Sequence, residues 1–195
     1  MELNLTGALL LNFSPAECQL HYANFAKAQF VGGADFEDAQ FTDVAIFQGA
    51  QFTDAVDFQG ARFTEGAIFQ DARFTDLAIF RGTQFTRRPA DFQGAQFPGG
   101  VDFGGAQFTR RAIFQGAQFT GGAIFQDARF IDLAIFQDAQ FTDASDFAGA
   151  RVASAAGPGS VWPPGWTTRP AKPDKGEDPD FLYLTRVEEA QSLAT

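Results

Sequence analysis

Residues 67–77, Ala-Ile-Phe-Gln-Asp-Ala-Arg-Phe-Thr-Asp-Leu, are one copy of an 11-residue unit that fills most of this chain. From Phe25 to Phe147, phenylalanines recur at spacings that alternate between five and six. The alternation is broken once, by a spacing of seven between Phe85 and Phe92. Such regular recurrence of a large apolar residue indicates a repeat architecture, in which neighbouring units bury their phenylalanines together.

An 11-residue repeat could also belong to a helical seam, because 11 residues in three turns give about 3.67 residues per turn. The two Phe of one unit would then lie about 140° apart around the helix, so they form no single apolar stripe. The residues between them are mostly Gly, Thr, Asp and Gln, with few of the Leu, Lys and Glu that favour helices. A helix is therefore rejected.

Short strands explain the unit. In Ala-x-Phe, Ala and Phe point to one side and the middle residue to the other, and the Gly, Asp and Thr that follow are typical of corners. Coils stacked about 4.8 Å apart would place Phe on Phe and pair each strand with its neighbours, which is a β-solenoid. Periodicity allows a two-sided coil made of one unit or a four-sided coil made of two. On the four-sided coil, outward Ile and Asp residues fall into separate columns, which favours the larger coil.

Tandem Ala-x-Phe-x-x units resemble the pentapeptide-repeat family, specifically its Phe-rich branch with alternating 5 and 6 spacing. The resemblance covers about residues 20–152. It implies an all-β fold, a right-handed quadrilateral β-helix with the central Phe and the preceding Ala inward. Every second corner would carry one extra residue, so that a coil holds two of the 11-residue units.

Three segments are expected. Residues 1–24 read as an irregular first coil that caps the N-terminal end, and residues 25–152 are the pentapeptide-repeat solenoid. Residues 153–195 are expected to hold a linker, a Trp-Pro-Pro-Gly-Trp cap and a short C-terminal α-helix.

Within this last segment, residues 167–177 are polar and expected to be mobile, and the helix is predicted from Asp178 to about Leu193. Its apolar face is too small to fold alone, which favours docking on the end of the solenoid or a homodimer through the C-terminal region. The candidate residues for this cap or dimer are Trp162, Trp166, Phe181, Leu184 and Val187.

Composition argues against catalysis. The chain has one cysteine, Cys18, and one histidine, His21, which leaves no Cys/His metal cluster and no evident nucleophile with a base. We expect no enzyme activity and no cofactor. Neither an apolar run long enough for a membrane span nor a signal peptide is visible, so a cytoplasmic protein is expected.

The net charge of the chain limits the kinds of partner that it can bind. The net charge of −10 predicts no direct binding to nucleic acid. We therefore expect a non-enzymatic scaffold for protein–protein interaction with an unidentified protein partner. The alternative comes from the resemblance, because some pentapeptide-repeat proteins are acidic mimics of DNA that bind DNA gyrase and protect it from topoisomerase inhibitors.

Two surfaces are candidates for that partner. The seven-residue interval contains Arg87, Arg88 and Pro89, and on a 22-residue coil Arg110 and Arg111 fall at the same corner one layer further on. These guanidinium groups either pair with nearby carboxylates as ordinary surface charges or face an anionic partner. The second candidate is an outward hydrophobic column formed by Ile46, Ile68, Ile113 and Ile135.

Overall fold

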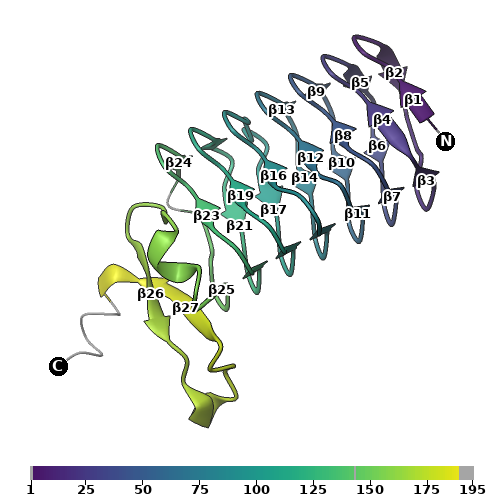
Figure 1. Ribbon diagram of the computed structural model, residues 1–195. Helices are drawn as coiled ribbons and strands as arrows, with labels where there is room; N and C mark the ends of the chain where they lie inside the picture. The colour runs from purple at the N-terminus through teal and green to yellow at the C-terminus, as the bar shows by residue number, and fades with distance from the viewer. Residues whose placement is uncertain (1, 143, 189–195) are drawn as a thin grey trace.

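The computed structural model describes residues 2–142 and 144–188 of the protein. The chain winds into a right-handed, all-β solenoid whose coils stack along one axis, and a small β-hairpin lies at its C-terminal end (Figure 1). Each coil has four short sides, here called faces 1 to 4 in the order in which the chain visits them. Among the described residues, no helix has the length and apolar character needed to cross a membrane.

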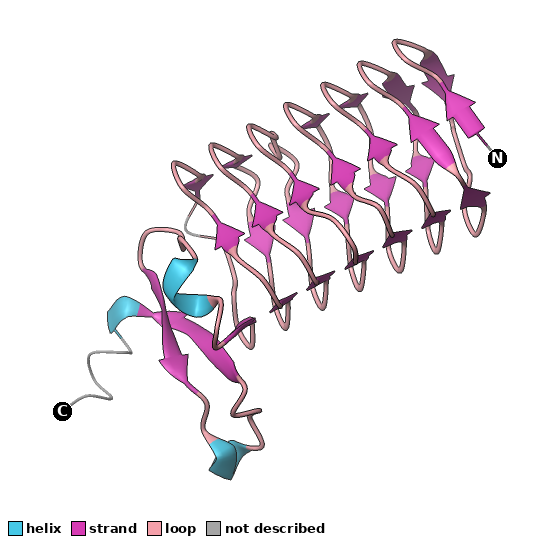
Figure 2. Cartoon of the chain, in the orientation of Figure 1, coloured by secondary structure: helices cyan, strands magenta, loops and turns pink. Residues whose placement is uncertain are grey.

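The strands of each face form parallel ladders along the solenoid (Figure 2). Face 1 contains β1 (Glu2–Asn4), β4 (Tyr22–Asn24), β8 (Ala45–Ile46), β12 (Ala67–Ile68), β16 (Ala90–Asp91), β19 (Ala112–Ile113) and β23 (Ala134–Ile135). Face 2 contains β2 (Leu9–Leu11), β5 (Gln29–Val31), β9 (Gln51–Phe52) and β13 (Arg73–Phe74), followed through bridges at Gln96 by β20 (Gln118–Phe119) and β24 (Gln140–Phe141).

Face 3 contains β6 (Ala34–Asp35), β10 (Val56–Asp57), β14 (Ala78–Ile79), β17 (Val101–Asp102) and β21 (Ala123–Ile124). Face 4 contains β3 (Gln19–Leu20), β7 (Gln40–Phe41), β11 (Arg62–Phe63), β15 (Gln84–Phe85), β18 (Gln107–Phe108), β22 (Arg129–Phe130) and β25 (Arg151–Ala153). The antiparallel strands β27 (Phe181–Arg186) and β26 (Trp166–Pro170) then extend face 4 beyond β25.

The strand register decides between the two coil sizes in favour of the four-sided, 22-residue coil. Ala45 pairs with Ala67, and Gln40 pairs with Arg62, an offset of 22 in both cases. Across the seven-residue interval the offset becomes 23, because Ala67 pairs with Ala90. The extra residue is therefore confined to one corner, and the ladder continues unchanged on both sides of it.

The backbone conformation at the corners explains why Gly or Asp commonly occurs two residues after a Phe. Asp71 and Gly94, for example, occupy the same corner in successive coils with φ of 54° and 66°. This left-handed region costs Gly nothing and is tolerated by Asp. Most strands are only two residues long, because the chain turns so soon.

The core is a stack of phenylalanine rings. Rings on the same face lie nearly parallel from coil to coil, as in Phe47–Phe69 with centroids 4.7 Å apart and Phe69–Phe92 with centroids 4.8 Å apart. Rings on opposite faces meet edge to face, as in Phe69–Phe80 with an interplanar angle of 89°. Both arrangements suit the quadrupole of the ring. The alanines beside them are also buried, and so are Val56 and Val101 where valine takes the same position.

The N-terminal segment, residues 2–24, joins the same ladders. β1 pairs with β4 and β2 with β5, so this segment is a coil of the solenoid from residue 2 onward. Its half-buried Leu5, Leu10 and Phe13 cover the core of the next coil, although they do not follow the Phe spacing. β1 and β2 are the terminal strands of their sheets.

The prediction of a C-terminal helix is wrong. Phe181–Arg186 is β27, which pairs with β25 and β26, and the other named elements of this segment are the 3-10 turns η1 (Gly157–Gly159) and η2 (Pro173–Lys175). Of the described residues in the predicted helix, Val187 and Glu188 alone are α-helical, and residues 189–195 lie outside the described part. The open edge of β25 offers a ladder of hydrogen bonds, which overrides the local helix signals.

The mobility expected for residues 167–177 stays a prediction, but the stretch has regular structure, because it contains most of β26 and all of η2. Its two ends are joined by a bidentate ion pair between Arg169 and Glu177, with both N–O distances 2.7 Å. The backbone N–H of Lys172 donates a further hydrogen bond to Glu177. The hydrogen bonds from Arg169, aided by the one from Lys172, lower the pKa of Glu177 from 4.5 to about 2.

This pKa predicts acid-sensitive stability. Because the pKa of Glu177 is lower in the folded chain, its contribution is complete above about pH 4.5 and is lost as the pH falls towards 2. We expect Glu177→Gln to lower the free energy of unfolding by about 1–3 kcal/mol at pH 7, and by much less at pH 2.5. Denaturant titrations of both proteins at the two pH values measure this. A difference that stays constant with pH would contradict the assigned role.

Candidate functional site

The corner between faces 4 and 1 is where the repeat departs from its pattern. In successive coils it carries Asp43, Glu65, the segment 86–89, the segment 109–111 and Asp132. The backbone N–H of Ala90 donates to the carbonyl of Arg111 at 3.0 Å, so the second Arg pair lies directly next to the bulge formed by the first. We call Arg87, Arg88, Arg110 and Arg111 the arginine edge.

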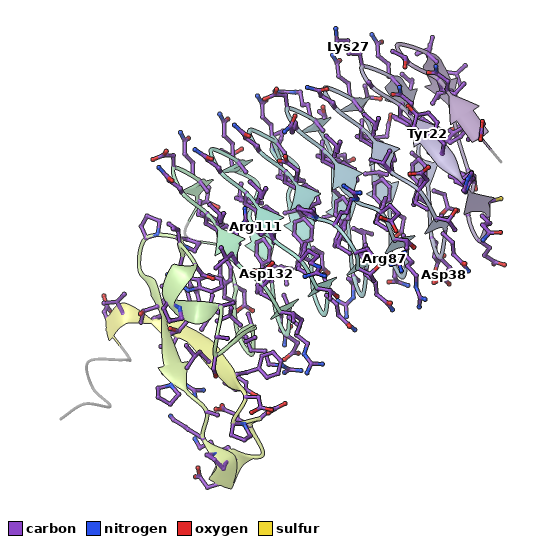
Figure 3. The ribbon with its side chains drawn as sticks, viewed as in Figure 1. Tyr22, Lys27, Asp38, Arg87, Arg111 and Asp132 are labelled. Carbon is purple, nitrogen blue, oxygen red and sulfur yellow. The ribbon has the colours of Figure 1, made fainter. Side chains whose placement is uncertain are left out.

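The four arginines are all exposed but differ in their contacts. Arg87 Nη1 lies 2.9 Å from Glu65 Oε1, and Arg88 Nε lies 3.3 Å from Glu65 Oε2. Within residues 2–142 and 144–188, neither Arg110 nor Arg111 forms an ion pair. Figure 3 shows Arg87, Arg111 and Asp132 on the same long side of the rod. The edge therefore contains one half in which two arginines share the single carboxylate of Glu65, and one half without an ion pair among the described residues.

The contacts of Glu65 with Arg87 and Arg88 affect its pKa. The hydrogen bond from Arg87 is the largest cause that holds this pKa below its usual value of 4.5, and Arg88 contributes in the same direction. Glu65 thus contacts both arginines of the bulge at once.

A surface groove of about 670 Å³ lies beside the bulge, over the corner and face 1. Gly66 provides no side chain at its centre, while Arg88 and Pro89 project from the next coil. The remaining lining comes from His21, Thr42, Asp43, Val44, Glu65, Ile68 and Asp91. The bulge that holds the inserted residue therefore has the second arginine pair on one side and the groove on the other.

The predicted hydrophobic column is divided. Ile46 and Ile68 are neighbours in β8 and β12, and Ile113 and Ile135 are neighbours in β19 and β23, but Asp91 of β16 stands between the two pairs. All four isoleucines are half-buried. Ile68 lines the groove, whereas Ile135 forms a bridge with Val161. The column is therefore interrupted at the level of the bulge.

The C-terminal candidates lie against the end of the solenoid. The ring of Trp162 is 5.7 Å from that of Phe130, and the ring of Trp166 is 5.0 Å from that of Phe147. Phe181 and Leu184 are buried, while Val187 is 37% exposed. Because most of these apolar groups pack within one chain, the argument for a homodimer from an uncovered helix face does not apply.

Cation–π contacts reinforce this end. Arg129 lies 4.6 Å from the ring centroid of Phe181, and Arg186 lies 4.4 Å from that of Trp166. Such contacts contribute about 0.5–2 kcal/mol each. They were not anticipated, because only the strand pairing brings β27 over face 4.

The solenoid has counterparts among known proteins. The family described as "Pentapeptide repeats (9 copies)" matches residues 16–61, 47–88, 86–118 and 104–151. One similar solved structure is HetL, a pentapeptide repeat protein involved in heterocyst differentiation regulation from the cyanobacterium Nostoc sp. strain PCC 7120. It is 17% identical, with 85% of this chain and 92% of that chain covered and a TM-score of 0.25.

A second is QnrB1, a plasmid-mediated fluoroquinolone resistance protein, solved as a trypsin-treated variant. It is 16% identical, with 79% of this chain and 88% of that chain covered and a TM-score of 0.29. No curated protein matches the chain. The family matches together span most of the solenoid, the part of the chain whose strands pair coil on coil. The chain therefore belongs to the pentapeptide-repeat family.

Proposed function

We propose that this protein is a non-enzymatic scaffold that binds a protein partner through the arginine edge. The observation that carries the proposal is the pair Arg110 and Arg111, which are exposed and form no ion pair within the described residues of a chain with a net charge of −10. A protein selected only for solubility has no need to gather cations at one corner. An acidic surface on a partner would supply the missing counter-charges.

The proposal is tested by changing Arg87, Arg88, Arg110 and Arg111 together to Gln. We expect melting close to that of the wild type, because the side chains are exposed, and loss of the partner that the wild-type protein captures by cross-linking in its own cell extract. A control with Arg62, Arg73 and Arg81 changed to Gln also removes surface cations, but at other corners and faces, and should retain the partner. Equal capture by all three proteins would contradict the proposal.

A second candidate function, mimicry of DNA toward gyrase, is favoured by the carboxylates of face 3. Asp35, Asp57, Asp102 and Asp146 point outward in one column, interrupted by Ile79 and Ile124. A rod with this charge could occupy a site built for a polyanion. A supercoiling assay with purified gyrase decides the matter: inhibition that is lost when the four Asp become Asn supports the mimic. Unchanged supercoiling at large molar excess excludes it.

A further inference from the structure

The groove beside the bulge has a chemistry different from that of the arginine edge. Its apolar lining comes from Val44, Ile68 and Pro89, which belong to three successive coils. Gly66 leaves space in the middle coil. A side chain at this position would approach Arg88 Cβ and the carbonyl of Pro89. The result is an apolar trough about two coil spacings, or roughly 10 Å, long.

Carboxylates stand at both ends of this trough. Asp43 lies in the coil before Gly66, and Asp91 lies in the coil after it. Their hydrogen bonds come from neutral donors. The backbone N–H of Val44 donates to Asp43, and the Gln70 side-chain amide at 2.7 Å and the backbone N–H of Gln93 at 3.0 Å donate to Asp91. Neutral donors leave the negative charges in place, whereas Glu65 between them is balanced by Arg87 and Arg88.

From this arrangement we infer that the groove binds a lysine or arginine side chain of the protein partner. Its methylene stem would lie along Val44 and Ile68, and its cation would meet the carboxylate of Asp43 or Asp91. This inference rests on the proposed function and identifies the chemistry of the partner. A nucleic acid, which offers only anions, would be repelled by the same two carboxylates.

The position of the arginine edge completes the description of the partner. Arg110 and Arg111 lie two coils beyond the coil of Gly66, about 10 Å along the rod, which an extended chain spans with about three residues. The matching segment of the partner therefore carries a basic residue followed, three or four positions later, by acidic residues. The basic residue enters the groove, and the acidic ones meet Arg110 and Arg111.

The test uses a synthetic peptide, acetyl-Gly-Ser-Arg-Gly-Ser-Glu-Glu-Gly-amide, and NMR titration of the backbone amides of the full chain. We expect saturable shifts at Val44, Gly66 and Ile68, together with shifts at Arg110 and Arg111. A matched peptide with citrulline in place of Arg has nearly the same shape without the charge. It should bind about fivefold more weakly and lose the groove shifts.

The double variant Asp43→Asn, Asp91→Asn should weaken the arginine peptide by a similar factor, since Asn has nearly the same shape and keeps one acceptor oxygen while removing the charge. Equal binding of the two peptides, or no saturable shift at the groove, would overturn the inference. So would groove shifts caused by single-stranded DNA. The proposal for the arginine edge is tested independently, because its experiment compares partner capture by the four-Gln variant with capture by the control that has Arg62, Arg73 and Arg81 changed to Gln.

Discussion

Replacing Phe103 with Ala is expected to lower the free energy of unfolding by about 3–5 kcal/mol. The ring of Phe103 is fully buried and stacks between those of Phe80 and Phe125, with centroids 4.9 and 5.0 Å away. Phe92 and Phe114 touch it edge to face at 5.3 and 5.5 Å. Each of these rings is itself held by the coil ladders. The cavity therefore cannot collapse, which is the situation in which a large-to-small change costs most.

Chemical denaturation of the purified variant measures this loss. Gln107→Ala is the matched control, because Gln107 belongs to the following strand but points outward and is exposed. We expect a change within about 0.5 kcal/mol for the control. Equal stability of the two variants would show that the phenylalanine stack contributes little to the fold.

The second large effect is expected at Gly121, where two coils approach backbone to backbone. A Cβ added at this position would overlap the backbone nitrogen of Gly100 and the carbonyl oxygen of Pro98. The backbone N–H of Gly121 also donates to the carbonyl of Phe97 at 3.1 Å, so the segment cannot move away freely. We expect Gly121→Ala to cost about 3 kcal/mol, the upper end of the usual range for overpacking.

Gly116→Ala separates this effect from ordinary backbone strain. Gly116 has a φ of 65°, but an added Cβ would have no atom within 4 Å. Its replacement should cost only about 1 kcal/mol, the penalty of the left-handed conformation. Thermal melts of both variants provide the comparison. A Gly121→Ala protein as stable as the Gly116→Ala protein would mean that the corner can widen without loss.

The solenoid could be predicted because the Phe spacing and the corner residues both indicate it. The Phe spacing gives the inward column, and the residues Gly and Asp appear where the backbone turns left-handed, as at Gly94 and Asp71. Even the seven-residue interval left the neighbouring register intact, because a corner can absorb one residue without moving the strands that flank it.

The C-terminal segment could not be predicted in this way, because its structure depends on a distant partner. Asp178 and Pro179 are typical helix-start residues, and Phe181, Leu184 and Val187 share a helical face in the sequence. The same residues also fit a strand, and the open edge of β25 decides between the two. The local sequence of residues 178–188 does not indicate that the edge of β25 lies beside it.

The groove was likewise hidden from sequence reasoning. The segment 87–89 identified the bulge, but the hollow requires a glycine in the coil before it and two carboxylates from different coils. Gly66 and Pro89 are separated by one coil plus the inserted residue, so comparison of positions at that offset is the signal that could have revealed it.

The central claim, that the arginine edge contacts a protein partner, is tested most directly by photo-cross-linking in the cells that make the protein. A photoreactive amino acid is placed either at Arg111 or at Gln126, an exposed residue at the corner between faces 3 and 4. The account predicts one discrete cross-linked protein from position 111 and no corresponding product from position 126. The same product from both positions, or none from position 111, would contradict it.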